Sequence, residues 1–249
     1  MNRNETPPNI SVLIPTKNMN RYIPGLLRNI TEQTIPGDEI LILFDGTKVE
    51  PTLKALMEGY PQVKIFQSKQ ANGVSNARNF LAQKAKHDII RFQDADDFLA
   101  PYALASTRHT IPRLKSWRLL IGGQFLYADK VFHHVVLSAL DTKFSKVLMT
   151  DNILLVNMCF FHKPSFIKSG GFDPKISFQE DWDLWLRYLR LWGDEAFTAT
   201  RYVFGIYNIF QAERQAKNHN RTVDGMPVTD YFFRKNGFPP PKKRDPKST

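Results

Sequence analysis

Segments that predict strands alternate with segments that predict helices along the first half of the chain. Strands are predicted at 10–15, 39–44, 63–66 and 88–93, and the first two are continuous apolar runs typical of burial on both faces. Apolar residues at helical spacing predict helices over 22–32, 53–60, 74–85 and 101–114. This alternation predicts an α/β fold with a mostly parallel central sheet flanked by helices.

The second half of the chain is less regular. Strands are predicted at 119–127, 131–137, 153–162 and 197–204, and helices at 164–169, 179–192 and 208–218. The two patterns meet near residues 115–117. We expect one continuous domain over residues 1–233, made of a 1–115 half and a 116–233 half, followed by a tail at 234–249.

Composition narrows the class of protein. At 249 residues the chain can bury a substantial core. Its single cysteine, Cys159, excludes an internal disulfide and is expected in the core. No apolar run is long enough to span a bilayer, and the polar N-terminus does not resemble a signal peptide. We therefore expect a cytoplasmic protein.

Positive charge is concentrated at the C-terminus. The formal net charge is +10, and residues 234–249 carry six Lys or Arg, one Asp and four Pro. Such a tail is expected to be extended or disordered. Anionic lipid would attract it with about 1 kcal/mol per basic residue, which suits peripheral contact with the inner face of a membrane. Nucleic acid, or solubility alone, would also explain its charge.

An acidic cluster follows the predicted strand at 88–93. Asp94, Asp96 and Asp97 place three carboxylates within four residues. Like charges this close repel one another unless a cation lies between them, and hard oxygen ligands suit Mg²⁺ or Mn²⁺. The cluster on its own is also compatible with a solvated acidic turn before a helix.

Polar residues also end two other predicted strands. Residues 16–18 (Thr-Lys-Asn) follow the first strand, and Asp45-Gly46 follows the second. Ligands of parallel α/β sheets bind outside the carboxyl ends of the strands. These ends and the acidic cluster should therefore converge on one edge of the sheet.

Five motifs, in order, resemble those of family 2 glycosyltransferases, and the similarity extends over residues 10–207. They are Ser11–Asn18 (SVLIPTKN), Glu39–Gly46 (EILILFDG), Gly73–Asn79 (GVSNARN), Asp94–Asp97 (DADD), and Gly170–Asp173 (GGFD) followed by Glu180-Asp181. The resemblance implies a GT-A fold, with a Rossmann-like nucleotide-sugar half at 1–115 and a smaller mixed acceptor half at 116–233. It also implies inverting, metal-assisted transfer of a hexose or N-acetylhexosamine from a nucleotide-sugar, with UDP favoured, to a glycan or lipid-linked acceptor.

The same resemblance suggests roles at the donor site. Asp96 would be the first ligand of Mn²⁺ or Mg²⁺, with Asp97 beside it, and Asp94 would face the donor ribose or orient the metal shell. Asp45 would read the nucleobase. The nucleotide site would also include Pro15, Thr16 and Asn18.

Arg78 has two readings. It lies one turn into a helix that starts after Gly73, where a phosphate is favoured and an arginine can bind it bidentately. Alternatively, Arg78 pairs with a carboxylate such as Asp94 and holds the site together.

Asp181 is the candidate catalytic base. A sugar hydroxyl must lose its proton as it attacks, and a carboxylate within hydrogen-bond reach can accept that proton. Glu180 would shape the acceptor site or fix the helix start. Both acids also suit a helix N-terminus for electrostatic reasons alone. Trp185 is expected in the core, whereas Trp182 could pack in the core or stack on an acceptor sugar.

The chain departs from the family pattern at three positions. Lys17 stands where relatives usually carry Tyr, and Phe44 stands where they carry Asp. Many relatives have a histidine shortly after the tyrosine that matches Tyr207, but here the next histidine is His219. The metal shell would therefore be completed by His219, or by water and phosphate.

Two other functions would explain part of the sequence. A nucleotidyltransferase shares a similar acidic metal site but normally needs a Gly-rich phosphate loop after its first strand, and residues 16–21 contain no glycine. A non-catalytic basic module for membrane or nucleic acid would explain the tail but not the acidic strand ends. We expect a nucleotide-sugar and an acceptor as partners, and no nucleic acid.

Overall fold

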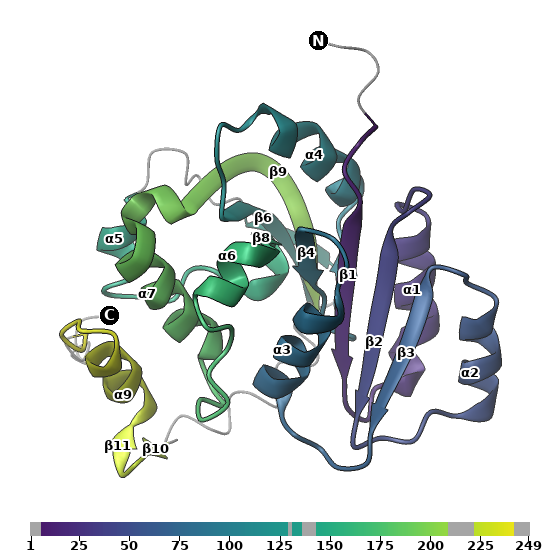
Figure 1. Ribbon diagram of the computed structural model, residues 1–249, viewed down its shortest axis with the longest axis horizontal. Helices are drawn as coiled ribbons and strands as arrows, with labels where there is room; N and C mark the ends of the chain where they lie inside the picture. Colours follow the sequence, from purple (N-terminus) through teal and green to yellow (C-terminus); the bar gives the residue numbers. More distant parts are fainter. Residues whose placement is uncertain (1–5, 129–130, 136–142, 209–221, 242–249) are drawn as a thin grey trace.

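The computed structural model describes residues 6–128, 131–135, 143–208 and 222–241. Within them, nine strands form one sheet in the order β3-β2-β1-β4-β8-β6-β9-β5, with β7 paired to β6 (Figure 1). The strands are β1 (Ile10–Thr16), β2 (Glu39–Asp45), β3 (Val63–Ser68), β4 (Ile89–Phe92), β5 (Phe98–Leu99), β6 (Leu119–Ala128), β7 (Val131–Val135), β8 (Cys159–His162) and β9 (Phe197–Asn208).

Helices cover the sheet, and a short ribbon of β10 (Thr222–Val223) and β11 (Met226–Pro227) precedes the last of them. The described α-helices are α1 (Ile23–Thr31), α2 (Pro51–Glu58), α3 (Val74–Lys84), α4 (Ala103–Thr110), α5 (Phe144–Val147), α6 (Lys163–Lys168), α7 (Glu180–Trp192) and α9 (Val228–Lys235). None of these helices has the length and apolarity needed to cross a bilayer.

The first four strands form the predicted parallel sheet. β1 lies between β2 and β4, and β2 pairs with β3, all in parallel. Alternate residues of β1 enter different cores: Leu13 packs in the core that includes α3, and Val12 in the one that includes α1 and α2. Burial on both faces explains the continuous apolar runs of β1 and β2.

The sheet becomes mixed beyond β4. β8 is antiparallel to both of its neighbours, β4 and β6, and β5 is antiparallel to β9. β6 and β9 run parallel to each other. The smaller half of the chain therefore extends the same sheet, so that both halves share one continuous hydrogen-bonded scaffold.

Three predicted segments differ in the structure. The strand expected at 153–162 begins only at Cys159, since residues 156–158 form a 3₁₀ turn. There the carbonyl of Asn157 accepts from Arg91 instead of joining a strand ladder. The helix expected from residue 101 begins at Ala103, because Tyr102 has a left-handed backbone (φ 63°). β9 continues past residue 204 to Asn208.

Other differences concern the C-terminal part. The helix predicted at 208–218 lies outside the described residues, which stop at 208 and resume at 222. Asn208, the first residue of that prediction, is the last residue of β9. Helix α9 was not predicted, and its last turn contains Arg234 and Lys235, which the sequence had assigned to the tail.

Arg91 connects three segments behind the acidic cluster. Its side chain is fully buried, and its guanidinium donates to the carbonyls of Asn157, Cys159 and Phe204. Gly205 allows this close packing, because a Cβ atom there would lie 2.5 Å from the Asn157 carbonyl oxygen. β9 can therefore approach residue 157 only with glycine at this position.

We expect Gly205→Ala to lower the free energy of unfolding by about 1–3 kcal/mol, because backbone must move to admit the methyl group. Urea denaturation measures this loss. Gly25→Ala is the matched control: it lies within α1, and its Cβ would lie 3.9 Å from the Phe98 ring, an ordinary van der Waals distance. This control should stabilise the fold by about 0.4–1 kcal/mol. Equal stability of the Gly205→Ala variant and the unchanged protein would contradict the packing argument.

Candidate active site

A cavity of about 540 Å³ opens at the carboxyl ends of β1, β2 and β4. The α3 N-terminus, the segments around residues 152 and 180, and the end of β9 complete its wall. The structure brings together nearly all of the predicted site residues there: Pro15, Thr16, Asp45, Arg78, Asp94, Asp96, Asp97, Glu180 and Asp181. Asn18 does not line the cavity; it bonds to Thr47 instead.

Asp94 and Asp96 supply carboxylates at the cavity wall, and both are half-buried. Within the described ranges, no three His, Cys, Asp or Glu residues cluster closely enough to hold a metal ion. The donor set fits a hard cation that takes its remaining oxygens from phosphate and water. His219, the other candidate ligand, lies outside the described residues.

Asp97 has a different environment from its two neighbours. It is 2% exposed, and its carboxylate accepts hydrogen bonds from the Asn208 backbone N–H (2.9 Å) and the Asn157 amide (3.0 Å). Burial, followed by the negative charge of Asp94, raises the pKa of Asp97 well above its usual range. Asp97 thus fixes the end of β9 against the acidic cluster, so Asp96 is better placed as a metal ligand.

Asp45 anchors the loop that leads into α3. Its carboxylate accepts hydrogen bonds from the Ser68 hydroxyl (2.8 Å) and from the backbone N–H groups of Asn72 and Gly73 (both 2.9 Å). The predicted contact with a nucleobase would have to share these oxygens or replace one of the bonds. The nucleobase role of Asp45 therefore stays a prediction.

Arg78 joins the two halves of the site. Its guanidinium binds Asp94 at the end of β4 (2.9 Å) and Glu180 at the start of α7 (2.8 Å). Burial by itself would lower the pKa of Arg78, but the charges of the two acids outweigh it and raise the pKa. Of the two readings of Arg78, the structure shows the carboxylate pairing.

Asn79 and Gly171 explain two of the sequence motifs. The Asn79 side chain donates to the Phe172 carbonyl (2.7 Å) and accepts from the Phe172 N–H (2.8 Å). Gly171 has φ 66°, and a Cβ atom there would lie 2.5 Å from Asn79 Oδ1. The GVSNARN and GGFD motifs therefore contact each other directly, through residues 93 positions apart.

Asp181 lies in the first turn of α7, with its side chain buried. Its Oδ1 atom accepts from the Asn152 amide (2.9 Å) and from the Trp182 N–H (2.8 Å). Burial, followed by the negative charge of Glu180, raises the pKa of Asp181 to about 7. A carboxylate with this pKa can accept a proton near neutral pH and is suited to general-base catalysis.

Three contributors to the site were not predicted from the sequence. Asn152 and Asn157 donate hydrogen bonds to the cavity carboxylates of Asp181 and Asp97, but lone asparagines in an irregular segment carry no recognisable spacing. Tyr207, which was noted only as a family landmark, lines the cavity. Burial and then the surrounding carboxylates raise its pKa to about 12, so its phenol stays neutral and can donate a hydrogen bond.

The tryptophans of α7 face the core. The indole N–H of Trp182 donates to the Leu148 carbonyl and that of Trp185 to the Leu154 carbonyl. Both side chains are buried. The expected core position of Trp185 is confirmed, and Trp182 is likewise unavailable for stacking on a sugar.

Known glycosyltransferases are similar to this chain in sequence. Residues 11–114 match the model of glycosyl transferase family 2. An uncharacterized glycosyltransferase of Rickettsia typhi is 24% identical over 198 residues, which cover 77% of this chain and 62% of that protein. The minor teichoic acid biosynthesis protein GgaB of Bacillus subtilis is 27% identical over 182 residues, covering 69% of this chain and 20% of GgaB. The chain thus spans less than two thirds of the length of these relatives.

Solved structures show the same fold. TarS 1–349 of S. aureus in complex with UDP-GlcNAc has a TM-score of 0.65 at 17% identity, over 80% of this chain and 58% of that one. Mannosyltransferase PcManGT of Pyrobaculum calidifontis, in complex with GDP-Man and Mn²⁺, has a TM-score of 0.61 at 18% identity, over 81% and 57% of the two chains. Residues 11–114 are thus similar to family 2 glycosyltransferases, and the chain has the GT-A fold of these structures.

Because the pKa of Asp181 is raised, the stability of the protein should depend on pH. Its folded pKa of about 7 exceeds the unfolded value of about 3.9, so its contribution to stability is complete below pH about 4 and is lost as the pH rises through about 7. Asp181→Asn cannot ionise. We expect this variant to be more stable than the unchanged protein by about 1–3 kcal/mol at pH 8 and equally stable near pH 4.

Thermal unfolding across this pH range measures the difference. Asp224→Asn is the control, because Asp224 is exposed and its long ion pair with Lys175 spans 4.0 Å. A stability difference for Asp181→Asn that does not depend on pH would contradict the raised pKa.

Proposed function

We propose that the protein transfers a sugar from a nucleotide-diphosphate sugar, with UDP favoured, to a hydroxyl of a glycan or lipid-linked acceptor, with inversion. The observation that carries this proposal is the position of Asp181. A buried carboxylate with a pKa of about 7 shares one cavity with Asp94 and Asp96. That cavity thus combines a base for an acceptor hydroxyl with oxygen ligands for the cation of a diphosphate leaving group.

The contacts of Asp181 suit direct displacement. Among the described residues, both hydrogen bonds to its carboxylate are accepted by Oδ1, so Oδ2 is the oxygen that would accept a proton. Removing the hydroxyl proton as the oxygen attacks the anomeric carbon makes the hydroxyl a better nucleophile. Attack from the face opposite the departing nucleotide inverts the anomeric configuration.

A divalent metal, Mn²⁺ or Mg²⁺, would be held by Asp96 with Asp94 beside it, and would stabilise the negative charge of the departing diphosphate. Support comes from PcManGT, whose structure contains GDP-Man and Mn²⁺. Arg78, which binds Asp94, keeps this carboxylate in place. Asp97 holds the backbone of Asn208, and so fixes the cavity wall next to the metal ligands.

The acceptor and the place of action are part of the same proposal. GgaB is named for teichoic acid biosynthesis, and a chondroitin synthase of Escherichia coli is 34% identical over 100 residues, 39% of this chain and 14% of that protein. These names favour polysaccharide synthesis. We place the protein in the cytoplasm, with contact to anionic lipid through the basic residues of the 234–249 tail that follow α9. The match of residues 11–114 to glycosyl transferase family 2 favours this proposal over a nucleotidyltransferase or a non-catalytic module.

Nucleotide binding is the first test. We expect UDP with Mn²⁺ to raise the melting temperature by about 5–10 °C at 100 times its Kd, since this corresponds to about 2.7 kcal/mol. Asp96→Asn should lose the part of the shift that depends on Mn²⁺. GDP and dTDP are run in parallel to identify the preferred base. The donor-site assignment is wrong if none of these nucleotides gives a metal-dependent shift.

Loss of the base is the second test. We expect Asp181→Asn to lower kcat by about 10²–10⁴-fold and to leave the Kd for UDP unchanged. The kcat of the unchanged protein should rise with pH and level off above about 7. Both are measured as UDP release from UDP-sugars. Glu58→Gln, an exposed change at the end of α2, is the control. Full activity of Asp181→Asn would exclude Asp181 as the base.

A further inference from the structure

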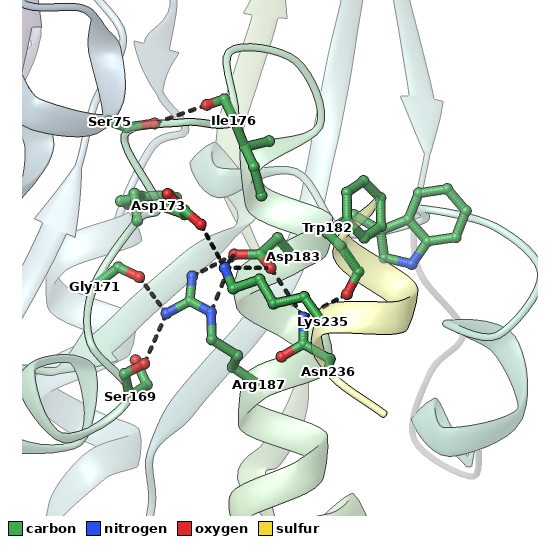
Figure 2. A network of polar contacts seen from close by, with 12 residues as sticks. Ser75, Ser169, Gly171, Asp173, Ile176, Trp182, Asp183, Arg187, Lys235 and Asn236 are labelled. Carbon is green, nitrogen blue, oxygen red and sulfur yellow. Dashed lines mark hydrogen bonds and ion pairs between the residues drawn. The ribbon is translucent and has the colours of Figure 1, made fainter. Parts of the chain in front are cut away.

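Helix α9 lies against the start of α7 and the GGFD loop, although it is distant in the sequence (Figure 2). Lys235, in its last turn, donates to Asp173 (2.5 Å) and to Asp183 (3.2 Å). The next residue, Asn236, donates its side-chain amide to the same Asp183 carboxylate (2.9 Å). The C-terminal end of α9 therefore reaches both the GGFD loop and the first turn of α7.

Asp183 is the centre of these contacts, and its side chain is 0% exposed. On its other side, the Arg187 guanidinium donates to Oδ2 through Nε (3.0 Å) and Nη2 (2.7 Å). Arg187 also donates to the carbonyls of Ser169 and Gly171. Two acids, Asp173 and Asp183, thus face two bases, Arg187 and Lys235. A buried carboxylate is tolerated when it is paired in this way, and removing one base leaves negative charge uncompensated.

The other end of α9 holds the residue at which α7 starts. Gln179 precedes α7 and has a left-handed backbone (φ 58°), an unfavourable conformation for a residue with a side chain. No side chain caps the helix at this position. The Thr229 hydroxyl of α9 donates to the Gln179 side-chain oxygen (3.2 Å). Such a conformation persists when its surroundings fix it, and Thr229 is one of those contacts.

Apolar packing completes the contact between the two helices. The Trp182 ring lies 5.6 Å from the Phe232 ring and 5.3 Å from the Phe233 ring, measured between centroids. Helix α9 therefore touches the residues at 179, 182 and 183. These residues flank Asp181 on both sides, so α9 restrains the turn that carries the candidate base.

We propose that α9 with Asn236, here called the C-terminal clamp (residues 228–236), positions Asp181, and that Lys235 and Thr229 are its positioning residues. The role assigned to Asp181 rests on the proposed function. The clamp lies outside the 11–114 match to the family model and beyond the motifs at 10–207. Without it, the first turn of α7 would open more often and Asp181 would leave its place in the cavity. Misplacement of a catalytic group by about 1 Å can cost on the order of 100-fold in rate.

Lys235→Met tests the clamp, because methionine keeps most of the length and apolar surface of lysine and removes its charge. We expect faster amide hydrogen exchange in the peptide covering residues 179–189, by about tenfold or more, with α3 unchanged. We also expect kcat, measured as UDP release from UDP-GlcNAc, UDP-glucose and UDP-galactose at 15 °C, to fall by about 10–100-fold with an unchanged donor KM. Lys235→Arg, which keeps the charge, should recover most of both properties.

Lys175→Met is the matched control. Lys175 is exposed and pairs only distantly with Asp224 (4.0 Å), so exchange and kcat should not change. Thr229→Val removes only the hydroxyl that contacts Gln179, and it should fold even if Lys235→Met does not. This variant should show the same changes in exchange and kcat, but smaller, by about 2–5-fold.

Hydrogen exchange and kcat test the clamp and the proposed function separately. If the unchanged protein releases no UDP from any of the three donors, the UDP-sugar proposal fails, and hydrogen exchange alone decides whether α9 restrains α7. Unchanged exchange at 179–189 in both Lys235→Met and Thr229→Val would overturn the clamp. A merely stabilising α9 would lower the melting temperature of Lys235→Met but keep its kcat at 15 °C, and that outcome would also overturn the positioning role.

Discussion

The ion pairs of Arg78 are the constraint on which the site depends. One buried guanidinium binds Asp94, in the 1–115 half of the chain, and Glu180, in the 116–233 half. The Phe172 ring lies 5.1 Å from its centre, and Asn79, the next residue, bonds the Phe172 backbone. Breaking a buried charge pair by removing one partner typically costs about 3–5 kcal/mol. One short stretch of α3 therefore holds the end of β4, the start of α7 and the GGFD loop together.

The carboxylates around the cavity differ in how deeply they are buried and in the groups that they contact. Asp97 is buried between amide donors, so burial favours its neutral form. Asp94 lies beside Arg78 and stays paired. Asp181 is buried next to Glu180, and its pKa rises to about 7. Similar side chains thus acquire different properties from burial and nearby charge alone.

Much of the fold and part of the site follow from local patterns. Continuous apolar runs predict the buried strands β1 and β2, and apolar residues at helical spacing predict α1 and α3. Each pattern reflects which faces of the element are buried. The short strand β5 and helix α9 gave no such pattern, since β5 has only two residues and α9 follows a stretch without regular spacing. Likewise Asn152 and Asn157 act through contacts made by folding, which no sequence spacing encodes.

The sequence by itself determined the α/β architecture, the edge of the sheet at which polar residues gather, and the resemblance to a glycosyltransferase family. These properties depend on the order and periodicity of residues, which the chain carries directly. Only the tertiary structure decided which carboxylates are free to act. The pairing of Arg78 with Glu180, the hydrogen bond of Asp97 to Asn208, the hydrogen bond of Asp181 to Asn152 and the contact of Lys235 with Asp183 all arise between residues far apart in the chain. Burial and electrostatics depend on distance in space, and folding sets those distances.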